Sequence, residues 1–218
     1  MADIYMSGIR LLENAKNAKE ALDGIDTARR KAVAECANEK KRAQLLTAGL
    51  LVQHGARVAL GDEAPDGIYD LAYTDLGKPY FKEIPEVHFS ISHSGDMVMV
   101  AVSDKEVGVD IQEWRELKAD IAGRFFHPEE KAHLEKLSAS ESEKAFFELW
   151  CLKESYIKFT GKGLTQALDE LNFLPVVTGG GYGVFEFTEN GTRIAAQLVE
   201  APHGYSAAFV EEVIGDEY

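Results

Sequence analysis

Two acidic residues and a lysine, carried by two short segments, are the side chains of this sequence best suited to chemistry. Residues 108–112 place Asp110 at the end of a β-rich run, and residues 150–158 place Glu154 and Lys158 among apolar residues. Two separated carboxylates and a lysine are the groups a protein needs to hold Mg²⁺ against a phosphate-bearing substrate. The two segments therefore predict a site for Mg²⁺ and phosphate.

The second segment is expected to lie in a long helix over residues 142–160. On a helix of 3.6 residues per turn, Phe147, Trp150, Glu154 and Lys158 share one face. Most of the other positions are apolar, so the helix is expected to be central, where an unpaired carboxylate is costly. An ion pair between Glu154 and Lys158, worth about 0.3–0.5 kcal/mol if exposed, is the alternative to metal binding.

Composition limits the class of protein. The 218 residues can form one domain or two small ones, and 23 basic against 37 acidic residues give a net charge of −14. This acidity argues against general binding to nucleic acid or to anionic membranes. Two distant cysteines predict no disulfide framework. The first residues lack the apolar run that is typical of a signal peptide, and no stretch approaches the roughly 18 apolar residues of a membrane span, so neither feature is expected. We expect a cytoplasmic protein.

The elements around the chemical residues follow the order helices, strands, helices, strands. The patterns predict helices over 9–59 with a buried stripe that includes Val58, a hairpin of strands 87–92 and 97–102, a strand over 107–111, a helix start at 126–130, the helix over 142–160, and strands over 184–187, 194–199 and 205–210. This order predicts two similar α+β units, residues 1–112 and 113–218, with a ligand in the cleft between them.

Five motifs in chain order resemble those of the Sfp-type 4′-phosphopantetheinyl transferases. They occupy residues 77–79, 89–94, 108–111, 125–130 and 150–164. The resemblance implies an α+β fold of two similar subdomains related by a pseudo-two-fold axis, with coenzyme A in the cleft. It also implies transfer of the 4′-phosphopantetheine arm of coenzyme A to a serine of an acyl or peptidyl carrier protein, with release of 3′,5′-ADP.

The resemblance assigns roles at the first pair of segments. Asp110 and Glu154 would bind Mg²⁺ together with the coenzyme A pyrophosphate, and Glu154 would also be the general base, directly or through a water. Lys158 would stabilise charge on the pyrophosphate as it is cleaved. Many members have a glutamate where this chain has Gln112. Either the Gln112 amide or a water would complete the metal site.

The resemblance also assigns a nucleotide-binding group. Lys78, Ser92 and His93 would bind the end of coenzyme A that carries the 3′-phosphate, and Lys41 or Arg42 would add to this group. A histidine beside a hairpin turn is otherwise a common structural or surface residue, and that alternative stays open for His93.

The sequence does not name the carrier, so polyketide, non-ribosomal peptide and fatty-acid partners are all compatible. Because carriers are usually acidic and this chain is acidic too, we expect docking through an apolar patch with a few local Lys or Arg and little salt sensitivity. We expect a monomer. A non-catalytic adaptor that binds coenzyme A or a carrier is the first alternative, and another Mg²⁺-dependent phosphoryl or nucleotidyl enzyme is the second.

Overall fold

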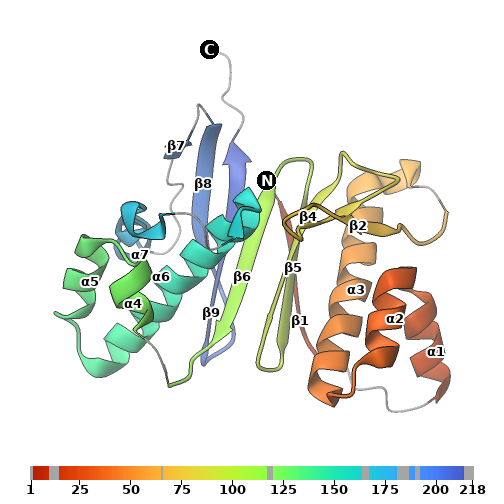
Figure 1. Cartoon of the computed structure of the whole chain (residues 1–218), viewed down its shortest axis with the longest axis horizontal. Helices are drawn as coiled ribbons and strands as arrows, with labels where there is room; N and C mark the ends of the chain where they lie inside the picture. Colours follow the sequence, from red (N-terminus) through yellow and green to blue (C-terminus); the bar gives the residue numbers. More distant parts are fainter. Residues whose placement is uncertain are drawn as a thin grey trace. The chain divides into compact units, whose positions relative to one another are not determined.

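The computed structural model describes residues 2–9, 15–64, 66–116, 120–163, 167–180, 187–189 and 192–213. The chain divides into two compact units, Met1–Val107 and Gly108–Tyr218. Each unit contains a helix of 22 residues and a sheet, which confirms the predicted α+β class (Figure 1). The sequence placed the boundary after Gln112, whereas this division falls between Val107 and Gly108. The pseudo-two-fold relation stays a prediction.

The first unit combines a helical layer with two small sheets. Strands β1 (Asp3–Gly8), β5 (Met97–Ser103) and β4 (His88–Ser94) form an antiparallel sheet in that order, and β2 (Leu71–Tyr73) pairs with β3 (Pro79–Phe81). The helices are α1 (Ala15–Asp23), α2 (Thr27–Glu35) and α3 (Glu39–Leu60), followed by the 3-10 turn η1 (Gly61–Glu63). The predicted hairpin of two strands before residue 104 is therefore confirmed.

The contact between α3 and β5 corrects the predicted buried stripe. Val58 is half exposed, at 50%, whereas the buried positions of α3 include the small residues Ala48 and Ala56. Small residues bring the helix close to the sheet: a Cβ built on Gly55 would lie 2.5 Å from Cγ2 of Val102. Because the closest packing is made by residues with little hydrophobicity, a pattern of large apolar side chains mispredicts this face.

The second unit is built around one central helix. Its sheet has the order β6 (Val107–Glu113), β9 (Tyr205–Val213), β8 (Thr192–Val199) and β7 (Phe187–Glu189). Helix α6 (Ala139–Thr160) packs along β9 (Figure 1). The remaining elements are α4 (Ile121–Phe125), α5 (Pro128–Leu134), η3 (Leu168–Glu170) and α7 (Leu174–Thr178). Aromatic and aliphatic side chains from α6, β8 and β9 form the core of the unit.

The predicted helix boundaries of this unit are confirmed in outline. Helix α5 begins at Pro128, and His127 and Glu130 form its capping box. Helix α6 begins at Ala139, three residues before the predicted position, and ends at Gly161, whose φ of 67° is left-handed. The predicted strands over 194–199 and 205–210 are present within β8 and β9. Of the predicted strand 184–187, residues 184–186 lie outside the described residues.

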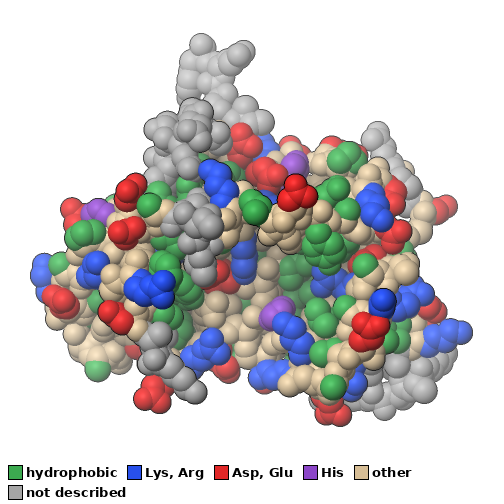
Figure 2. All heavy atoms as spheres, viewed as in Figure 1, with side chains coloured by type: hydrophobic (Ala, Val, Ile, Leu, Met, Phe, Trp, Pro, Cys, Tyr) green, Lys and Arg blue, Asp and Glu red, His purple; other side chains and the backbone are tan. Residues whose placement is uncertain are grey.

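The surface carries charges of both signs. Figure 2 shows acidic and basic side chains interspersed on the face in view, with apolar side chains between them. Three of the exposed large apolar side chains belong to the β2–β3 hairpin and its turn: Tyr73, Leu76 and Tyr80. Among the described helices, none has both the length and the apolar character needed to cross a bilayer.

Candidate functional site

Asp110 and Lys158 meet in the second unit, where β6 lies against α6. Asp110 is 1% exposed. Its Oδ1 accepts a hydrogen bond from Nζ of Lys158 at 2.6 Å, and its Oδ2 accepts one from Nε2 of Gln112 at 2.9 Å. Within the described part of the chain, the ion pair of Lys158 therefore runs across to the strand, and none joins it to Glu154 along the helix.

Gly108 sets how closely β6 approaches α6. A Cβ at this position would lie 2.0 Å from the backbone oxygen of Ser155 and 2.3 Å from the backbone nitrogen of Phe159. A side chain cannot occupy that space. Because strand residues alternate between faces, Asp110 lies on the same face of β6 as Gly108. The glycine therefore makes the close approach, and the aspartate two residues later reaches α6 because of it.

Two short polar side chains fasten α6 to β9. The Cys151 thiol donates to the backbone oxygen of Ser206 at 3.1 Å, and the Ser155 hydroxyl donates to that of Ala208 at 2.9 Å. Burial raises the pKa of the Cys151 thiol well above its usual range, and the Asp110 carboxylate raises it further. The thiol consequently stays protonated and acts as a donor.

Glu154 lies beside the Asp110–Lys158 pair. Burial raises the pKa of Glu154, the charge of Asp110 raises it further, and the charge of Lys158 opposes both effects. Within the described residues its carboxylate makes no hydrogen bond or ion pair, so its position is set by the backbone of α6. A half-buried carboxylate near a second carboxylate is favourable only when a cation or a proton accompanies it.

Glu113 does not replace the acid that is missing at Gln112. Strand alternation places Glu113 on the other face of β6, and there its Oε1 accepts a hydrogen bond from the Tyr205 hydroxyl at 3.3 Å. Gln112 shares the face of Asp110 and donates to it. Among the described residues, the acidic groups of the candidate site are therefore Asp110 on β6 and Glu154 on α6.

This donor set suits a hard divalent cation such as Mg²⁺, which prefers oxygen ligands. Among the described residues no group of three or more His, Cys, Asp or Glu side chains could hold a metal by itself. Mg²⁺ is bound through one or two carboxylates and completes its octahedral shell with substrate phosphate oxygens and water. Asp110 and Glu154 fit that requirement, whereas a metal that needs a full set of protein ligands would not be satisfied.

Lys78 lies in the first unit and has its own counter-ion there. Its ammonium pairs with one carboxylate oxygen of Glu106, and the other oxygen lies 3.3 Å from Nδ1 of His88. Burial alone would raise the pKa of Glu106, but the hydrogen bonds from His88 and Lys78 outweigh it and lower this pKa to about 2. Sequence reasoning missed this triad, because its members lie on three distant segments without a shared motif.

The other predicted nucleotide-binding residues lie on β4 and α3. Ser92 is buried and His93 is partly exposed, and they stand opposite Met99 and Val98 in the β4–β5 register. Arg42, in the first turn of α3, lies 3.9 Å from Glu39. Ser92 and His93 are thus neighbours on one strand, whereas Arg42 and Lys78 lie on separate elements, each next to its own glutamate.

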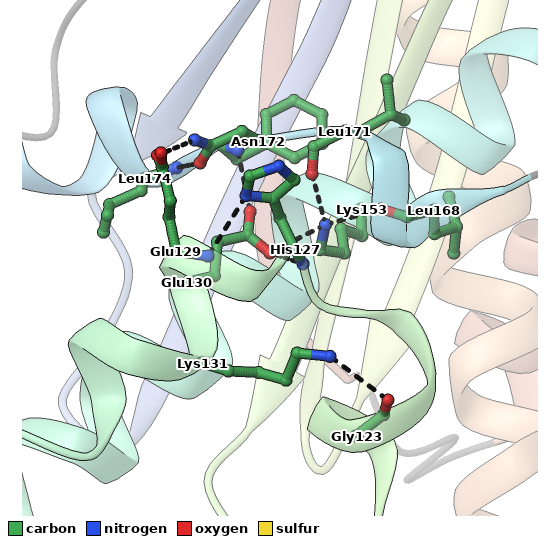
Figure 3. A network of polar contacts seen from close by, with 11 residues as sticks. Gly123, His127, Glu129, Glu130, Lys131, Lys153, Leu168, Leu171, Asn172 and Leu174 are labelled. Carbon is green, nitrogen blue, oxygen red and sulfur yellow. Dashed lines mark hydrogen bonds and ion pairs between the residues drawn. The ribbon is translucent and has the colours of Figure 1, made fainter.

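A buried ion pair, of which one member directly precedes Glu154 in α6, was not predicted from the sequence (Figure 3). Nζ of Lys153 lies 2.9 Å from Oε2 of Glu130, and both side chains are 0% exposed. The ammonium also donates to the backbone oxygens of Leu168 and Leu171, at 2.9 and 2.8 Å. Burial lowers the pKa of Lys153, and the Glu130 carboxylate opposes that effect.

Both carboxylate oxygens of Glu130 accept hydrogen bonds from backbone nitrogens. Its Oε1 accepts from the backbone nitrogen of Phe173 at 2.7 Å, and its Oε2 accepts from that of His127 at 2.8 Å. Nζ of Lys153 also lies 5.5 Å from the ring centres of Phe126 and Phe173. The sequence did signal half of this network, because an acid three residues into a helix start is typical of a capping box.

The candidate site lies within the part of the chain that matches a protein-family model. Residues 106–210 match the family model described as the 4′-phosphopantetheinyl transferase superfamily. A 4′-phosphopantetheinyl transferase of Bacillus subtilis is 39% identical over 127 residues, 58% of this chain and 56% of the relative. Another, of Bacillus pumilus, is 47% identical over 92 residues, 42% of this chain and 40% of the relative.

A third relative is the transferase Sfp of Bacillus subtilis strain 168, which is 39% identical over 98 residues, 45% of this chain and 44% of the relative. The chain thus spans about half the length of the curated relatives it matches. Asp110, Glu154 and Lys158 all lie within residues 106–210.

Proposed function

We propose that this chain modifies carrier proteins with the 4′-phosphopantetheine arm of coenzyme A, because its residues 106–210 match the model of the 4′-phosphopantetheinyl transferase superfamily. The observation that carries the proposal is the meeting of Asp110 with Lys158, beside Glu154, inside the matched region. The serine oxygen of an acyl or peptidyl carrier would bond to the phosphorus attached to pantetheine. The bond to the second phosphate would break, and 3′,5′-ADP would leave.

We propose that Mg²⁺ binds between Asp110 and Glu154 when coenzyme A is present. Bound there, the ion would neutralise oxygens of the pyrophosphate and act as a Lewis acid. Gln112 would keep the Asp110 carboxylate in place through the hydrogen bond at 2.9 Å.

The chain's own side chains would handle the proton and the remaining charge. Glu154 would accept the proton of the serine hydroxyl, directly or through one water, a role that can contribute about 10²–10⁴-fold. Lys158, held by Asp110, would offset the negative charge that grows on the leaving phosphate. The balanced products are the modified serine, 3′,5′-ADP and one proton.

The nucleotide end of coenzyme A would be bound by residues of the first unit. We assign this role to Lys78, Ser92 and His93, with Arg42 as a further cation. Lys78 supports the assignment because Glu106 holds its ammonium in one place. A phosphate that binds there would share the lysine with that carboxylate.

Carrier docking would depend little on salt. The net charge of −14 would repel an acidic carrier, while the surface in Figure 2 mixes both signs and apolar side chains. We therefore propose an apolar contact with a few basic residues, made by a monomer in the cytoplasm. A steep loss of carrier affinity with added salt would contradict this part of the proposal.

The test is a mass-spectrometric assay with coenzyme A, Mg²⁺ and apo carriers from polyketide, non-ribosomal peptide and fatty-acid systems. We expect one carrier serine to gain the phosphopantetheine mass and 3′,5′-ADP to appear in equal amount. Asp110→Asn and Glu154→Gln should each lower the rate by about 10²-fold or more. Glu113→Gln is the matched control, since that acid lies on the other face of β6.

Three outcomes would overturn the proposal. No mass gain with any carrier would exclude the transfer, and binding of coenzyme A without turnover would favour an adaptor. Release of a different nucleotide would indicate another phosphoryl-transfer reaction.

A further inference from the structure

We propose that the buried pair of Glu130 and Lys153 positions Glu154 for proton transfer, an inference that rests on the proposed function. Lys153 would not touch substrate. It would act through the backbone of α6, which carries Glu154 as the next residue. The residues concerned all lie in the second unit.

Glu154 depends on its helix for its position. As shown above, its carboxylate makes no hydrogen bond or ion pair within the described residues. A catalytic base must lie within about 2.6–3.2 Å of the proton it accepts. A small rotation of α6 would therefore move the carboxylate and any metal ion that it binds, and no hydrogen bond or ion pair of the carboxylate with a described residue opposes that movement.

Helix α6 is held from two sides. Cys151 and Ser155 fasten one side to backbone oxygens of β9. Lys153 lies about 200° around the helix from Cys151, at about 100° per residue, and fastens the opposite side to Glu130. Contacts on one side alone would leave rotation about that contact line free, and the second anchor removes this freedom.

The second anchor is fixed by hydrogen bonds from all three N–H groups of the Lys153 ammonium. An ammonium has three N–H donors, and those of Lys153 meet Glu130, Leu168 and Leu171 at 2.8–2.9 Å. Glu130 in turn binds the backbone nitrogens at the start of α5 and at Phe173. The pair thus ties α6 to two other backbone segments, with every donor of the lysine used (Figure 3).

Stability alone does not explain why this position is ionic. Replacing both members of a buried pair with uncharged residues of similar volume is often neutral for stability, whereas removing one member leaves an uncompensated charge. The double variant Glu130→Gln with Lys153→Met keeps the volume and one acceptor for Phe173. It therefore separates loss of the anchor from the presence of a buried charge.

The experiment measures kcat and KM for coenzyme A in the full chain, well below the unfolding temperature of each variant. We expect the double variant to lose at least 10-fold in kcat while KM changes less than twofold. The matched control is Val176→Ala, a buried core residue of α7 that should lower thermal stability and leave kcat within twofold. Glu130→Asp, which keeps the charge and shortens the reach, should lose several-fold in kcat.

A double-mutant cycle tests whether the buried pair changes kcat through Glu154. If the pair acts only through Glu154, then adding Glu154→Gln to the double variant should give the rate of Glu154→Gln alone, within twofold. A purely structural role would instead multiply the two losses.

Each outcome decides the inference. Wild-type kcat in the double variant or in Glu130→Asp, or multiplied losses in the cycle, would overturn it. If the double variant does not fold, Glu130→Asp and its combination with Glu154→Gln decide in the same way. An inactive wild-type chain would instead refute the proposed function, so the two failures are distinguishable.

Discussion

Lys158 on α6 donates to the buried carboxylate of Asp110 on β6 at 2.6 Å, across 48 residues of sequence. The bond joins the two elements that carry the candidate site. It also keeps together two groups with different proposed roles: Asp110 would bind Mg²⁺, and Lys158 would offset charge on the leaving phosphate.

Removing the ammonium of Lys158 should lower the free energy of unfolding, because the buried carboxylate of Asp110 then loses its counter-ion. Lys158→Met leaves Asp110 with the neutral Gln112 as donor, and we expect a loss of about 1.5–3 kcal/mol in the free energy of unfolding. Urea unfolding at pH 7 measures it. Lys31→Met, which breaks an exposed i,i+4 pair with Glu35, is the control and should cost less than about 0.5 kcal/mol. Equal losses would contradict the prediction.

Gly108 should tolerate no side chain. Gly108→Ala would push a methyl group into the backbone of α6 at Ser155, 2.0 Å away, so helix and strand must separate. We expect a loss of about 3 kcal/mol or more, together with loss of transferase activity. Gly8→Ala is the control, because its Cβ would meet its nearest neighbour at 3.8 Å. A stable, active Gly108→Ala protein would show that the close approach does not matter.

The triad of Lys78, His88 and Glu106 should make stability depend on acid pH. The pKa of Glu106 is lowered from 4.5 to about 2, so its ionised form stabilises the fold fully above about pH 4.5. This contribution is lost as the pH falls towards 2. The stability difference between wild type and Glu106→Gln should therefore shrink over that range, as measured by urea unfolding at each pH.

Lys78→Met provides the check on that pH dependence. It removes one of the two donors that lower the pKa of Glu106, so it should remove part of the same pH dependence. A constant difference between wild type and Glu106→Gln across the range would refute the assignment.

The two cysteines should differ in reactivity. Cys151 is fully buried, donates to Ser206, and has a thiol pKa raised mainly by burial, whereas Cys36 is partly exposed. Thiolate is the reactive form. A disulfide reagent should therefore label one thiol in the native protein and two after denaturation. Cys36→Ser should abolish the native labelling, and rapid labelling of both thiols would disprove the burial of Cys151.

The elements that follow simple patterns could be predicted from the sequence. The β4–β5 hairpin alternates or is continuously apolar, and α6 is apolar on most positions and ends at Gly161. β1 could not be predicted, because its six residues carry little pattern and its place comes from pairing with β5. Val58 was mispredicted because the closest helix–sheet contact is made by small residues.

The candidate site could be predicted in its residues but not in its contacts. Asp110, Glu154 and Lys158 follow from short motifs, but the ion pair that the sequence suggested for Lys158 was with Glu154 along the helix. The structure pairs Lys158 with Asp110 across to the strand. The partners of Lys78 and Lys153 were missed for one reason. Glu106 and Glu130 reach them through the fold, over separations that no local spacing encodes.

The attachment of α6 to β9 has a consequence for the lengths of the two elements. Cys151 and Ser155 are four residues apart, a rise of about 6 Å in a helix, and the backbone oxygens of Ser206 and Ala208 are two residues apart, about 6.7 Å in a strand. The spacing of the two donors along the helix therefore nearly equals the spacing of the two acceptors along the strand. One residue inserted between Cys151 and Ser155 would turn all that follows by about 100° and carry Lys158 away from Asp110. Natural length variation in this protein should therefore fall outside α6 and β9.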